Sequence, residues 1–509
     1  MEEKVTSDLV GQRDLRIQKL QQLVKLGINP YPSKSFRKDS IGDILEDFEK
    51  FDGDETVLAG RLIAWREHGK LIFANILEQT GSIQLMIRKD DLVKDLKKGY
   101  LGWDNLQLLD IGDFIEAYGV IGKTKTGQIS LMVKSVRLLT KAIRPIPREL
   151  ENKEQRYRRR YLDLVIHPES VRMFERKSKF WQVQREFLKK EGFMEVEVPI
   201  MEAVTGGADA KPFITHHNAL DQDFYLRIST ELYQKRLIGG GFEKIYTFGP
   251  HFRNEGMDDE HLQEFYDIEW YWAYADYKDN MKLVKNLFLE IARKVYGKTD
   301  FETRGHKYDL ADEWKELDYS NLMKEHFDID IFNDSDEKIL KVIKEKNIEM
   351  GGEVNRNRMI DTLWKSIRAT ISGPAFLVNQ PKFISPLAKS HEDNKELTQR
   401  FQVIIAGSEL GNGYSEINDP QDQLERFLDQ QKLREGGDDE AHMLDIDFVE
   451  MLEYGMPPVS GYGHSERVFW FMENVTAREG TFFPQMRHET ENSTKEIYKG
   501  RVKFEKKKK

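Results

Sequence analysis

The sequence predicts an α+β protein with more than one domain, on three observations. The chain has 509 residues, which is too long for one compact core. Over residues 56–142 apolar residues recur with a period of two, which indicates strands, whereas the preceding segment has a helical period. Beyond residue 166, strand-like and helical segments follow one another in an order that suits an antiparallel sheet flanked by helices.

Composition excludes several kinds of site. Cysteine is absent, so the chain has no disulfide, no thiolate zinc site and no cysteine nucleophile, and it suits a reducing compartment. Acidic residues number 88 against 78 basic ones, for a net charge of −10, so any nucleic-acid contact has to use local patches. No apolar run approaches the ~20 residues of a membrane helix. We therefore expect a cytoplasmic protein that does not enter a membrane.

A helical arm is expected over residues 1–55. Within it, residues 8–27 have the spacing of an amphipathic helix, and Gly27 and Pro30 mark its end. The predicted apolar stripe consists of Leu15, Ile17, Leu20, Leu23, Val24 and Leu26.

Residues 56–142 predict a small β domain. Ile83, Leu85 and Ile87 alternate with more polar neighbours, and Gly69, Gly81 and Gly127 mark turns between strands. Residues 91–98 predict a short interposed helix. Short strands with one helix suit a Greek-key barrel such as the OB-fold, and a β-sandwich fits the periodicity nearly as well.

A stiff connector is expected next, because Pro145 and Pro147 fix the backbone of residues 143–147. It opens a linker over residues 143–165. A large domain is predicted over residues 166–490, with a mostly helical insertion at about 275–370, followed by a basic tail at 491–509. Neither a P-loop nor a dinucleotide-binding glycine motif occurs, so a bound nucleotide would have to be held by arginines.

Two strand-like segments carry acids beside bulky apolar residues. Glu269 and Tyr271 alternate with Trp270 in the first, and Asn412, Tyr414 and Glu416 share one face of the second. Burying an ionised carboxylate in such surroundings costs free energy unless a cation or a hydrogen-bond donor binds it. A substrate ammonium would serve, and a structural arginine or lysine is the simpler alternative for either acid alone.

Several motifs are similar to those of class IIb aminoacyl-tRNA synthetases, and most closely to the lysyl-tRNA synthetases. Residues 252–256, FRNEG, resemble motif 2, and residues 187–199, which end at Pro199, resemble motif 1, the dimer-forming motif of the class. Segments 206–218, 225–233 and 411–419 have lysyl-type wording. Residues 59–61, 69–73 and 123–127 resemble the anticodon-binding domain, which favours the OB-fold over the sandwich.

The resemblance implies a lysine site. Glu269, Tyr271 and Glu416 would hold the side-chain ammonium, to which two carboxylates and a phenol offer three acceptors. The other residues expected at the site are Glu231 and Gly207 for the α-amino group, Asn412 and Arg253 for the carboxylate, and Tyr414 on the same strand face.

The resemblance also implies an ATP and magnesium site. Arg253 would bind the α-phosphate, Phe265 would stack on adenine, and Arg467 would bind the γ-phosphate. Glu255 and His261 would contact the purine edge and the phosphates, with Gly463 permitting close approach of the backbone. Arg253, Arg467 and Glu409 are the expected catalytic residues. The lysine carboxylate is already an anion, so no general base is needed, and rate comes from positioning and electrostatics.

Three features depart from the family pattern. Gln402 stands beside Glu409 where a second magnesium-binding glutamate is usual, and motif 3 at residues 461–467 is one residue short. On a regular strand the side chain of Glu409 would point to the opposite face from that of Asn412, and a bulge at Gly411 would bring both side chains to one face. The motif 2 loop also differs, since Glu260 stands where a neutral or basic residue is usual.

The resemblance further implies anticodon contacts by Arg66, Phe73 and Gln84, because an aromatic platform with neighbouring donors stacks and hydrogen-bonds unpaired bases. Expected partners are tRNA(Lys), L-lysine, ATP and a second copy of the chain. Two alternatives stay open: an aspartyl- or asparaginyl-type synthetase of the same subclass, and an RNA-binding paralogue without catalysis.

Overall fold

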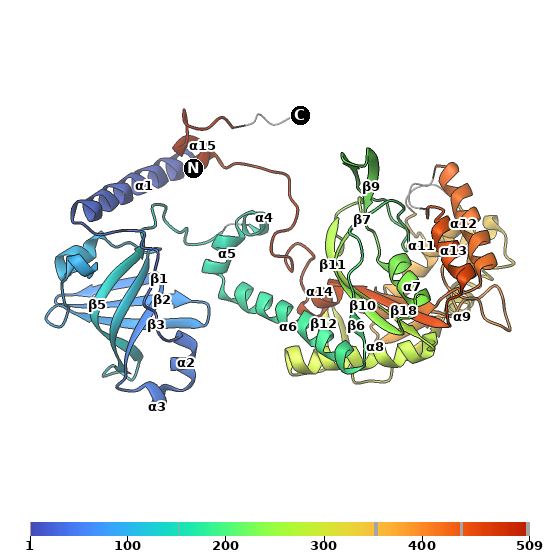
Figure 1. Ribbon diagram of the computed structural model, residues 1–509, viewed down its shortest axis with the longest axis horizontal. Coiled ribbons are helices and arrows are strands. Elements are labelled where there is room, and N and C mark those ends of the chain that lie inside the picture. Colours follow the sequence, from blue (N-terminus) through green and yellow to red (C-terminus); the bar gives the residue numbers. More distant parts are fainter. Residues whose placement is uncertain (1, 151, 351–354, 438–440, 505–509) are drawn as a thin grey trace. The chain divides into compact units, whose positions relative to one another are not determined.

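The computed structural model describes residues 2–150, 152–350, 355–437 and 441–504 (Figure 1). Contacts divide the chain into two compact units. One unit contains residues up to 156 with 161–166 and the segment from 487 onward, and the other contains residues 157–160 and 167–486. Within the described ranges, no helix is both long and apolar enough to cross a membrane.

Five strands of the first unit form a closed barrel in the order β1-β2-β3-β5-β4. The strands are β1 (Glu55–His68), β2 (Leu71–Glu78), β3 (Gly81–Arg88), β4 (Phe114–Lys123) and β5 (Ile129–Thr140). β3 and β5 pair in parallel and the other neighbours are antiparallel. The barrel confirms the OB-fold prediction and excludes the sandwich.

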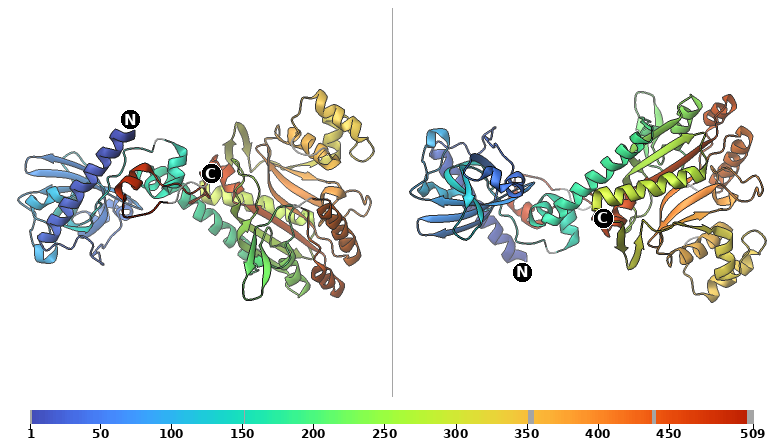
Figure 2. Two further views of the ribbon diagram at one scale, coloured as in Figure 1. Left: turned by 90° about the horizontal axis from the view of Figure 1, so that it is seen from above. Right: turned by 90° about the horizontal axis from the view of Figure 1, so that it is seen from below.

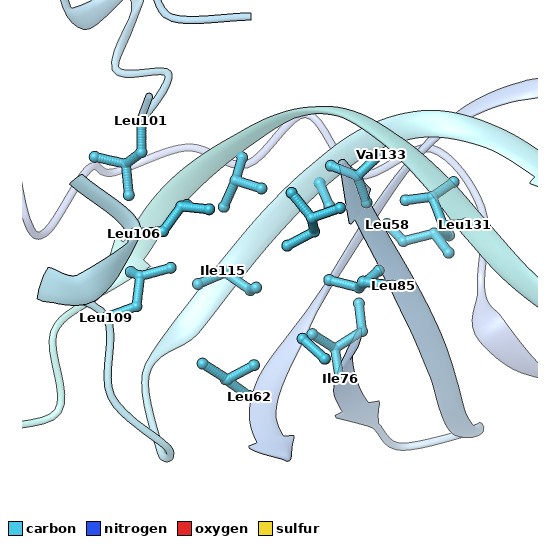
Figure 3. Close-up of a cluster of buried hydrophobic side chains, with 14 of the residues drawn as sticks. Leu58, Leu62, Ile76, Leu85, Leu101, Leu106, Leu109, Ile115, Leu131 and Val133 are labelled. Carbon is cyan, nitrogen blue, oxygen red and sulfur yellow. The ribbon is translucent and has the colours of Figure 1, made fainter. Parts of the chain in front are cut away.

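The alternating apolar residues point into the barrel, where Leu58, Ile76, Leu85, Ile115 and Leu131 form part of one buried cluster (Figure 3). Each such side chain contributes roughly 1.5–3 kcal/mol relative to an exposed position. Because the period is two, the alternate residues of the same strands are left on the outer surface of the barrel.

The helix predicted at residues 91–98 is largely wrong. Only a 3₁₀ turn, η1 (Leu96–Lys98), forms there, and a second one, η2 (Trp103–Leu108), follows. The side chain of Asp95 accepts a hydrogen bond from the backbone N–H of Lys98, and Gly99 adopts φ +84°. Local side-chain bonding of this kind gives the backbone an alternative to a helix.

The N-terminal helix is present as α1 (Glu2–Lys25), but its predicted stripe is only partly buried. Leu23 is inaccessible, whereas Leu15 and Val24 are more than half exposed. Arg16 takes part in the packing instead, donating to the carbonyl oxygens of Ile111 and Ala142 at 3.0 and 3.1 Å. Apolar spacing did not reveal this polar contact.

Further short helices belong to the first unit or cross its sequence boundaries with the second. They are α2 (Ile41–Glu46), α3 (Phe48–Phe51), α4 (Lys153–Arg158), α5 (Arg160–Ile166) and α15 (Asn492–Ile497). α15 packs against α1, so part of the segment predicted as a basic tail is helical. Lys506 to Lys509, the end of that tail, lie outside the described residues. α4 and α5 lie within or next to the segment predicted as a linker.

An eight-stranded sheet forms the centre of the second unit, in the order β14-β15-β16-β17-β18-β11-β10-β6. Its strands are β6 (Met194–Glu195), β10 (Lys244–Phe252), β11 (Glu264–Ala273), β14 (Lys315–Asp318), β15 (Ala375–Val378), β16 (Arg400–Ile405), β17 (Ser408–Ser415) and β18 (Val459–Ser465). The pairs at the two edges, β6–β10 and β14–β15, are parallel, and the pairs between them are antiparallel. The α+β prediction is confirmed.

One face of the sheet is covered by α6 (Pro168–Lys190) and α8 (Tyr277–Ile291), which lie side by side (Figure 2). Ile268 and Trp270 of β11 are fully buried, and the indole of Trp270 donates to Asn280 of α8 at 2.8 Å. The alternate residues of β11, Asp267 and Glu269, therefore belong to the opposite face.

The segment at 275–370 is mostly helical, as predicted, but it also contains strands. It contains a hairpin, β12 (Asp300–Thr303) with β13 (His306–Asp309), and the edge strand β14. The remaining elements of the unit are α7 (Glu231–Gly239), η3 (Ala292–Tyr296), α9 (Tyr319–Phe327), α10 (Asp336–Glu345), α11 (Arg356–Arg368), η4 (Lys382–Ile384), α12 (Pro420–Glu435), α13 (Ile446–Tyr454), α14 (Arg467–Glu473) and a small sheet of β7 (Met201–Glu202), β9 (Gln222–Leu226) and β8 (Ile214–His217).

Candidate functional site

A pocket of about 210 Å³ opens on the side of β11 opposite α6 and α8, between the loop that joins β10 to β11 and strands β16 to β18. The structure brings most of the residues predicted to bind nucleotide and metal to this pocket. They are Arg253, Glu255, His261, Phe265, Gln402, Glu409, Asn412, Gly463 and Arg467.

Arg253 and Phe265 form the flat part of the pocket. The guanidinium lies 5.3 Å from the centroid of the phenyl ring and is oriented by the carbonyl oxygen of Ile228 at 3.4 Å. A planar cation and a ring held together suit an aromatic base attached to a phosphate. His261 is less free than expected, because its Nδ1 pairs with the carboxylate of Asp258 at 2.8 Å.

Arg467 lies at the first residue of α14, directly after β18. Its guanidinium contacts Glu260 and donates to the hydroxyl of Ser408 at 2.8 Å. Burial lowers the pKa of Arg467 to about 10, which leaves the side chain charged at neutral pH. The shortened motif 3 therefore still delivers an arginine cation to the pocket.

A bulge brings Glu409 to the same pocket as Asn412. Val403 of β16 pairs with Gly411 and Ile404 pairs with Glu409, so Leu410 is the extra residue on β17. The extra residue changes the parity of the strand. The predicted bulge is confirmed, one residue before Gly411.

The side chains of Glu409 and Gln402 offer oxygen atoms to the implied Mg²⁺. One oxygen of Glu409 already accepts from Trp364 at 2.7 Å and Arg368 at 2.8 Å, and the amide nitrogen of Gln402 donates to the other oxygen at 3.0 Å. Burial raises the pKa of Glu409, but Arg368 and these hydrogen bonds outweigh it and the net shift is downward. One ionised carboxylate with an amide fits an ion that is held mainly by phosphates.

Next to this pocket, three carboxylates are buried together with two tyrosines. Glu231, Glu269 and Glu416 are 2%, 8% and 2% exposed. The hydroxyl of Tyr271 donates to Glu269 at 2.7 Å, and that of Tyr414 donates to Glu231 at 2.6 Å. The residues predicted for the amino-acid site therefore converge.

Ser229 and Thr230 hold Glu269 in place, a role that the sequence did not suggest. The hydroxyl of Thr230 donates to Glu269 at 2.6 Å and its backbone N–H donates at 3.2 Å, and Ser229 donates at 3.3 Å. Both residues immediately precede α7, whose first residue is Glu231.

Lys235 is a second residue that sequence reasoning missed. It is completely buried, and its ammonium lies 2.5 Å from Glu231 and also contacts Glu416. Its position one turn after Glu231 on the same helix is the signal that could have suggested an ion pair.

Even with Lys235 present, the cluster is short of positive charge. Burial raises the pKa of Glu269, and the neighbouring Glu231 raises it further. Burial likewise raises the pKa of Glu416 well above its ordinary value, although Lys235 opposes the change. A cationic ligand would relieve both shifts, because an opposite charge favours the ionised form.

The acids of the cluster lie at different distances from the nucleotide pocket, as their positions beside β18 show. A Cβ atom on Gly463, which lines the nucleotide pocket, would lie 3.2 Å from Cγ of Glu269. A Cβ atom on Gly461 would lie 2.5 Å from the Tyr271 ring and would overlap Glu416. Glu269 is thus nearer the nucleotide pocket, and Glu416 with Tyr271 is farther from it.

The loop that carries Gly207 closes against the start of α7. Gly207 has φ +89°, and a Cβ atom there would lie 2.7 Å from the hydroxyl of Ser229. Its N–H donates to Nδ1 of His442 at 3.3 Å, and Nε2 of His442 lies 3.1 Å from Asp209. A glycine is therefore required both for the backbone conformation and for the close approach.

In the other unit, the predicted base-binding residues line one groove of about 1060 Å³ on the barrel. Arg66 of β1 pairs directly with Phe73 of β2, and Gln84 lies on the adjacent strand β3. Phe73 is partly exposed and lies outside the barrel core. The hydroxyl of Ser130 donates to Oε1 of Gln84 at 3.0 Å, which leaves its amide nitrogen for the groove.

Comparisons with known proteins match both units. Residues 152–487 match the family described as "tRNA synthetases class II (D, K and N)", and residues 56–139 match "OB-fold nucleic acid binding domain". The chain is 42% identical over 486 residues to the lysine–tRNA ligase of Thermosipho africanus, an alignment that covers 93% of the chain and 96% of the relative. It is 42% identical to that of Thermotoga maritima, over 93% and 95%, and 40% identical to that of Christiangramia forsetii, over 96% and 90%.

Proposed function

The chain belongs to the lysine–tRNA ligases, a family of class II tRNA synthetases, and we propose that it joins L-lysine to tRNA(Lys) in two steps over its eight-stranded sheet. In the first step a carboxylate oxygen of lysine attacks the α-phosphorus of ATP, and pyrophosphate leaves. In the second step a terminal ribose hydroxyl of the tRNA attacks the carbonyl carbon of lysyl-adenylate, and AMP leaves.

The observation that carries this proposal is the buried acidic cluster beside the Arg253 pocket. Glu231 and Glu416 share the internal cation Lys235, and the pKa values of Glu269 and Glu416 are raised chiefly by burial. A substrate that brings positive charge is favoured there, and one that brings a further carboxylate is repelled. The cluster thus supports lysine over aspartate.

The neighbours of each acid support a specific pose for lysine. A Cβ atom on Gly207 would lie 2.9 Å from the Cβ atom of Glu231, so these two residues are adjacent. We therefore assign Glu231 and Gly207 to the α-amino group. Glu269 accepts a hydrogen bond from the hydroxyl of Tyr271 at 2.7 Å, and we assign these two residues, with Glu416, to the side-chain ammonium, as the resemblance implied.

Rate enhancement in the first step comes from fixed positive charge and alignment. Arg253 contacts the α-phosphate, where negative charge builds up during the in-line displacement, and Arg467 contacts the terminal phosphates. Asn412 is held by Nε of Arg400 at 2.8 Å and orients the lysine carboxylate. No residue has to remove a proton from the nucleophile.

Magnesium would be held by Glu409 together with the phosphates of ATP, and Gln402 would add a neutral oxygen ligand. The ion supplies charge neutralisation for the leaving pyrophosphate. Because Arg368 already compensates Glu409, we propose that a single ion binds at this position and that the phosphates of ATP supply most of its ligands.

The assembly and the location of the protein also belong to the proposal. Motif 1 resemblance and exposed apolar residues around it, Met194, Ile200, Met201 and Ile214, support a homodimer. The barrel groove with Arg66, Phe73 and Gln84 supports binding of the anticodon. Since tRNA is charged where translation takes place, we assign the protein to the cytoplasm.

Lysine-dependent exchange of labelled pyrophosphate into ATP, measured without tRNA, tests the proposal. We expect exchange with lysine and none with aspartate or asparagine. Exchange with aspartate alone would establish the other synthetase type, and a folded protein that is silent with every amino acid would establish a non-catalytic paralogue.

A further inference from the structure

Glu260, on the loop between β10 and β11, is surrounded by positive charge and donors. Its carboxylate contacts the guanidinium groups of Arg467 and Arg304. It also accepts a hydrogen bond from the hydroxyl of Ser408 at 2.7 Å. Two guanidinium groups and a hydroxyl around one anionic group are the kind of donor set that binds a phosphate.

Glu260 lies at the phosphate end of the nucleotide pocket. It lines that pocket together with Arg253, Glu409 and Arg467. Under the proposed function, Arg467 binds the terminal phosphate of ATP. A carboxylate that contacts Arg467 therefore occupies the place of that phosphate.

Arg304 is held beside Arg467 although the two residues come from different elements. It lies in the turn between β12 and β13, and its backbone N–H donates to the side chain of Asn474 at 3.2 Å. Its guanidinium lies 4.6 Å from the centroid of the Phe471 ring, and that of Arg467 lies 5.8 Å from the same centroid. One ring of α14 thus flanks both cations.

The side chain of Glu260 can withdraw without exposing a core. Residues 254–259 are all exposed, and Glu260 itself is only partly buried. Asp258 accepts from the backbone N–H groups of Glu260 and His261 at 2.7 and 2.8 Å, which stabilises the turn locally without fixing it to the sheet. Withdrawal of the Glu260 side chain therefore costs little buried surface.

We propose that Glu260 is an internal competitor of ATP, and that Arg304 acts with Arg467 as a second arginine for the terminal phosphates once Glu260 withdraws. This inference rests on the proposed nucleotide site and concerns the β- and γ-phosphates alone. Binding of ATP exchanges one carboxylate for a more highly charged triphosphate on the same two guanidinium groups. Binding of AMP, which lacks those phosphates, leaves the contacts of Glu260 in place.

The test is equilibrium binding of ATP and of AMP, without lysine, to the full chain and to single variants. For Glu260→Gln we expect ATP to bind about tenfold more tightly, because loss of the competing charge frees both arginines. For Arg304→Ala we expect ATP to bind about tenfold more weakly. Neither change should alter AMP binding by more than about twofold.

Asp259→Asn is the matched control, because it removes the same charge one residue earlier on the loop. Asp259 acts on Arg304 only through its electrostatic field, whereas the ion pairs with Arg304 and Arg467 belong to Glu260. It should change ATP binding less than Glu260→Gln does. Weaker or unchanged ATP binding by Glu260→Gln would overturn the competitor role. Equal loss of ATP and AMP binding by Arg304→Ala would show that Arg304 only supports the fold of the pocket. In that case Arg304→Lys should restore the binding of both nucleotides.

These outcomes are separable from those of the proposed function. ATP binding is measured without an amino acid, so a protein that fails lysine-dependent exchange can still confirm or overturn the roles of Glu260 and Arg304. If the protein performs the exchange but Glu260→Gln leaves its ATP affinity unchanged, the proposed function stands and the competitor role of Glu260 is wrong.

Discussion

The ammonium of Lys235 lies 2.5 Å from the carboxylate of Glu231, one turn earlier on α7, and both side chains are closed off from solvent. Lys235 also contacts Glu416, which directly follows β17, far away in the sequence. An internal lysine therefore stands in the pocket proposed to receive a lysine. It neutralises part of the acidic cluster and leaves the remainder for the substrate.

Replacing Lys235 by Met should destabilise the protein strongly. Removal of one partner from a buried ion pair leaves an uncompensated charge and costs about 3–5 kcal/mol. Chemical denaturation measures the loss. The double variant Lys235→Met with Glu416→Gln should regain part of the stability, because it removes one orphaned carboxylate, and a single-variant loss below about 1 kcal/mol would contradict the assigned pairing.

Glu269→Gln should impair lysine activation while ATP still binds. A charged hydrogen bond to the substrate ammonium is lost, at about 1.5–3 kcal/mol, which raises the lysine KM roughly ten- to hundredfold in the exchange assay. Glu473→Gln is the control, since Glu473 is a similarly buried acid whose partner is Arg176, at 2.6 Å. An unchanged lysine KM in Glu269→Gln would exclude Glu269 from the amino-acid site.

Stability should fall as pH rises because of Glu202. Burial raises the pKa of this carboxyl from 4.5 to about 8, against smaller opposing effects of Thr205 and Arg227. Between those two values the folded chain keeps a proton that the unfolded chain has released. The free energy of unfolding therefore decreases with pH across this window, by up to about 1.4 kcal/mol per pH unit.

Glu202→Gln removes that titration. The free energy of unfolding of the variant, relative to that of the unchanged protein, should therefore increase from pH 5 to pH 8 and level off above. Thermal unfolding at several pH values measures this difference. Two curves that stay parallel over the whole range would show that Glu202 is ionised in the folded protein.

Phe73→Ala should weaken tRNA charging and leave adenylate formation unchanged, because the groove and the sheet pocket lie in separate units. Loss of one base-stacking platform costs about 1–3 kcal/mol. The KM for tRNA and the rate of pyrophosphate exchange are the two measurements. Phe36→Ala serves as the control, since Phe36 is an exposed aromatic residue of the same unit outside the groove; equal effects of the two changes would remove Phe73 from the tRNA site.

Local patterns predicted the barrel well, since a period of two assigns each residue of β3 and β5 to the core or to the surface. They failed where structure depends on distant partners. β14 is a short strand whose only neighbour in the sheet, β15, lies beyond three helices, so nothing near it in the sequence indicates a strand. Residues 91–98 look helical, but the side chain of Asp95 redirects the backbone.

In the candidate site, too, some residues could be predicted from local motifs and others depend on distant contacts. Residues within motifs, such as Arg253, Glu269 and Glu416, could be named because each motif has recognisable neighbours. Lys235 and Arg304 could not, because their roles come from contacts across the fold. Glu260 meets Arg304 over 44 positions of sequence and Arg467 over 207.

The extra residue Leu410 divides β17 into two parts that can vary separately. Glu409 before it lines the proposed nucleotide pocket, and Asn412, Tyr414 and Glu416 after it belong to the proposed amino-acid site. A substitution in the second part leaves the first part in register. Amino-acid preference can therefore be redesigned on this strand while the machinery that activates the carboxylate stays intact.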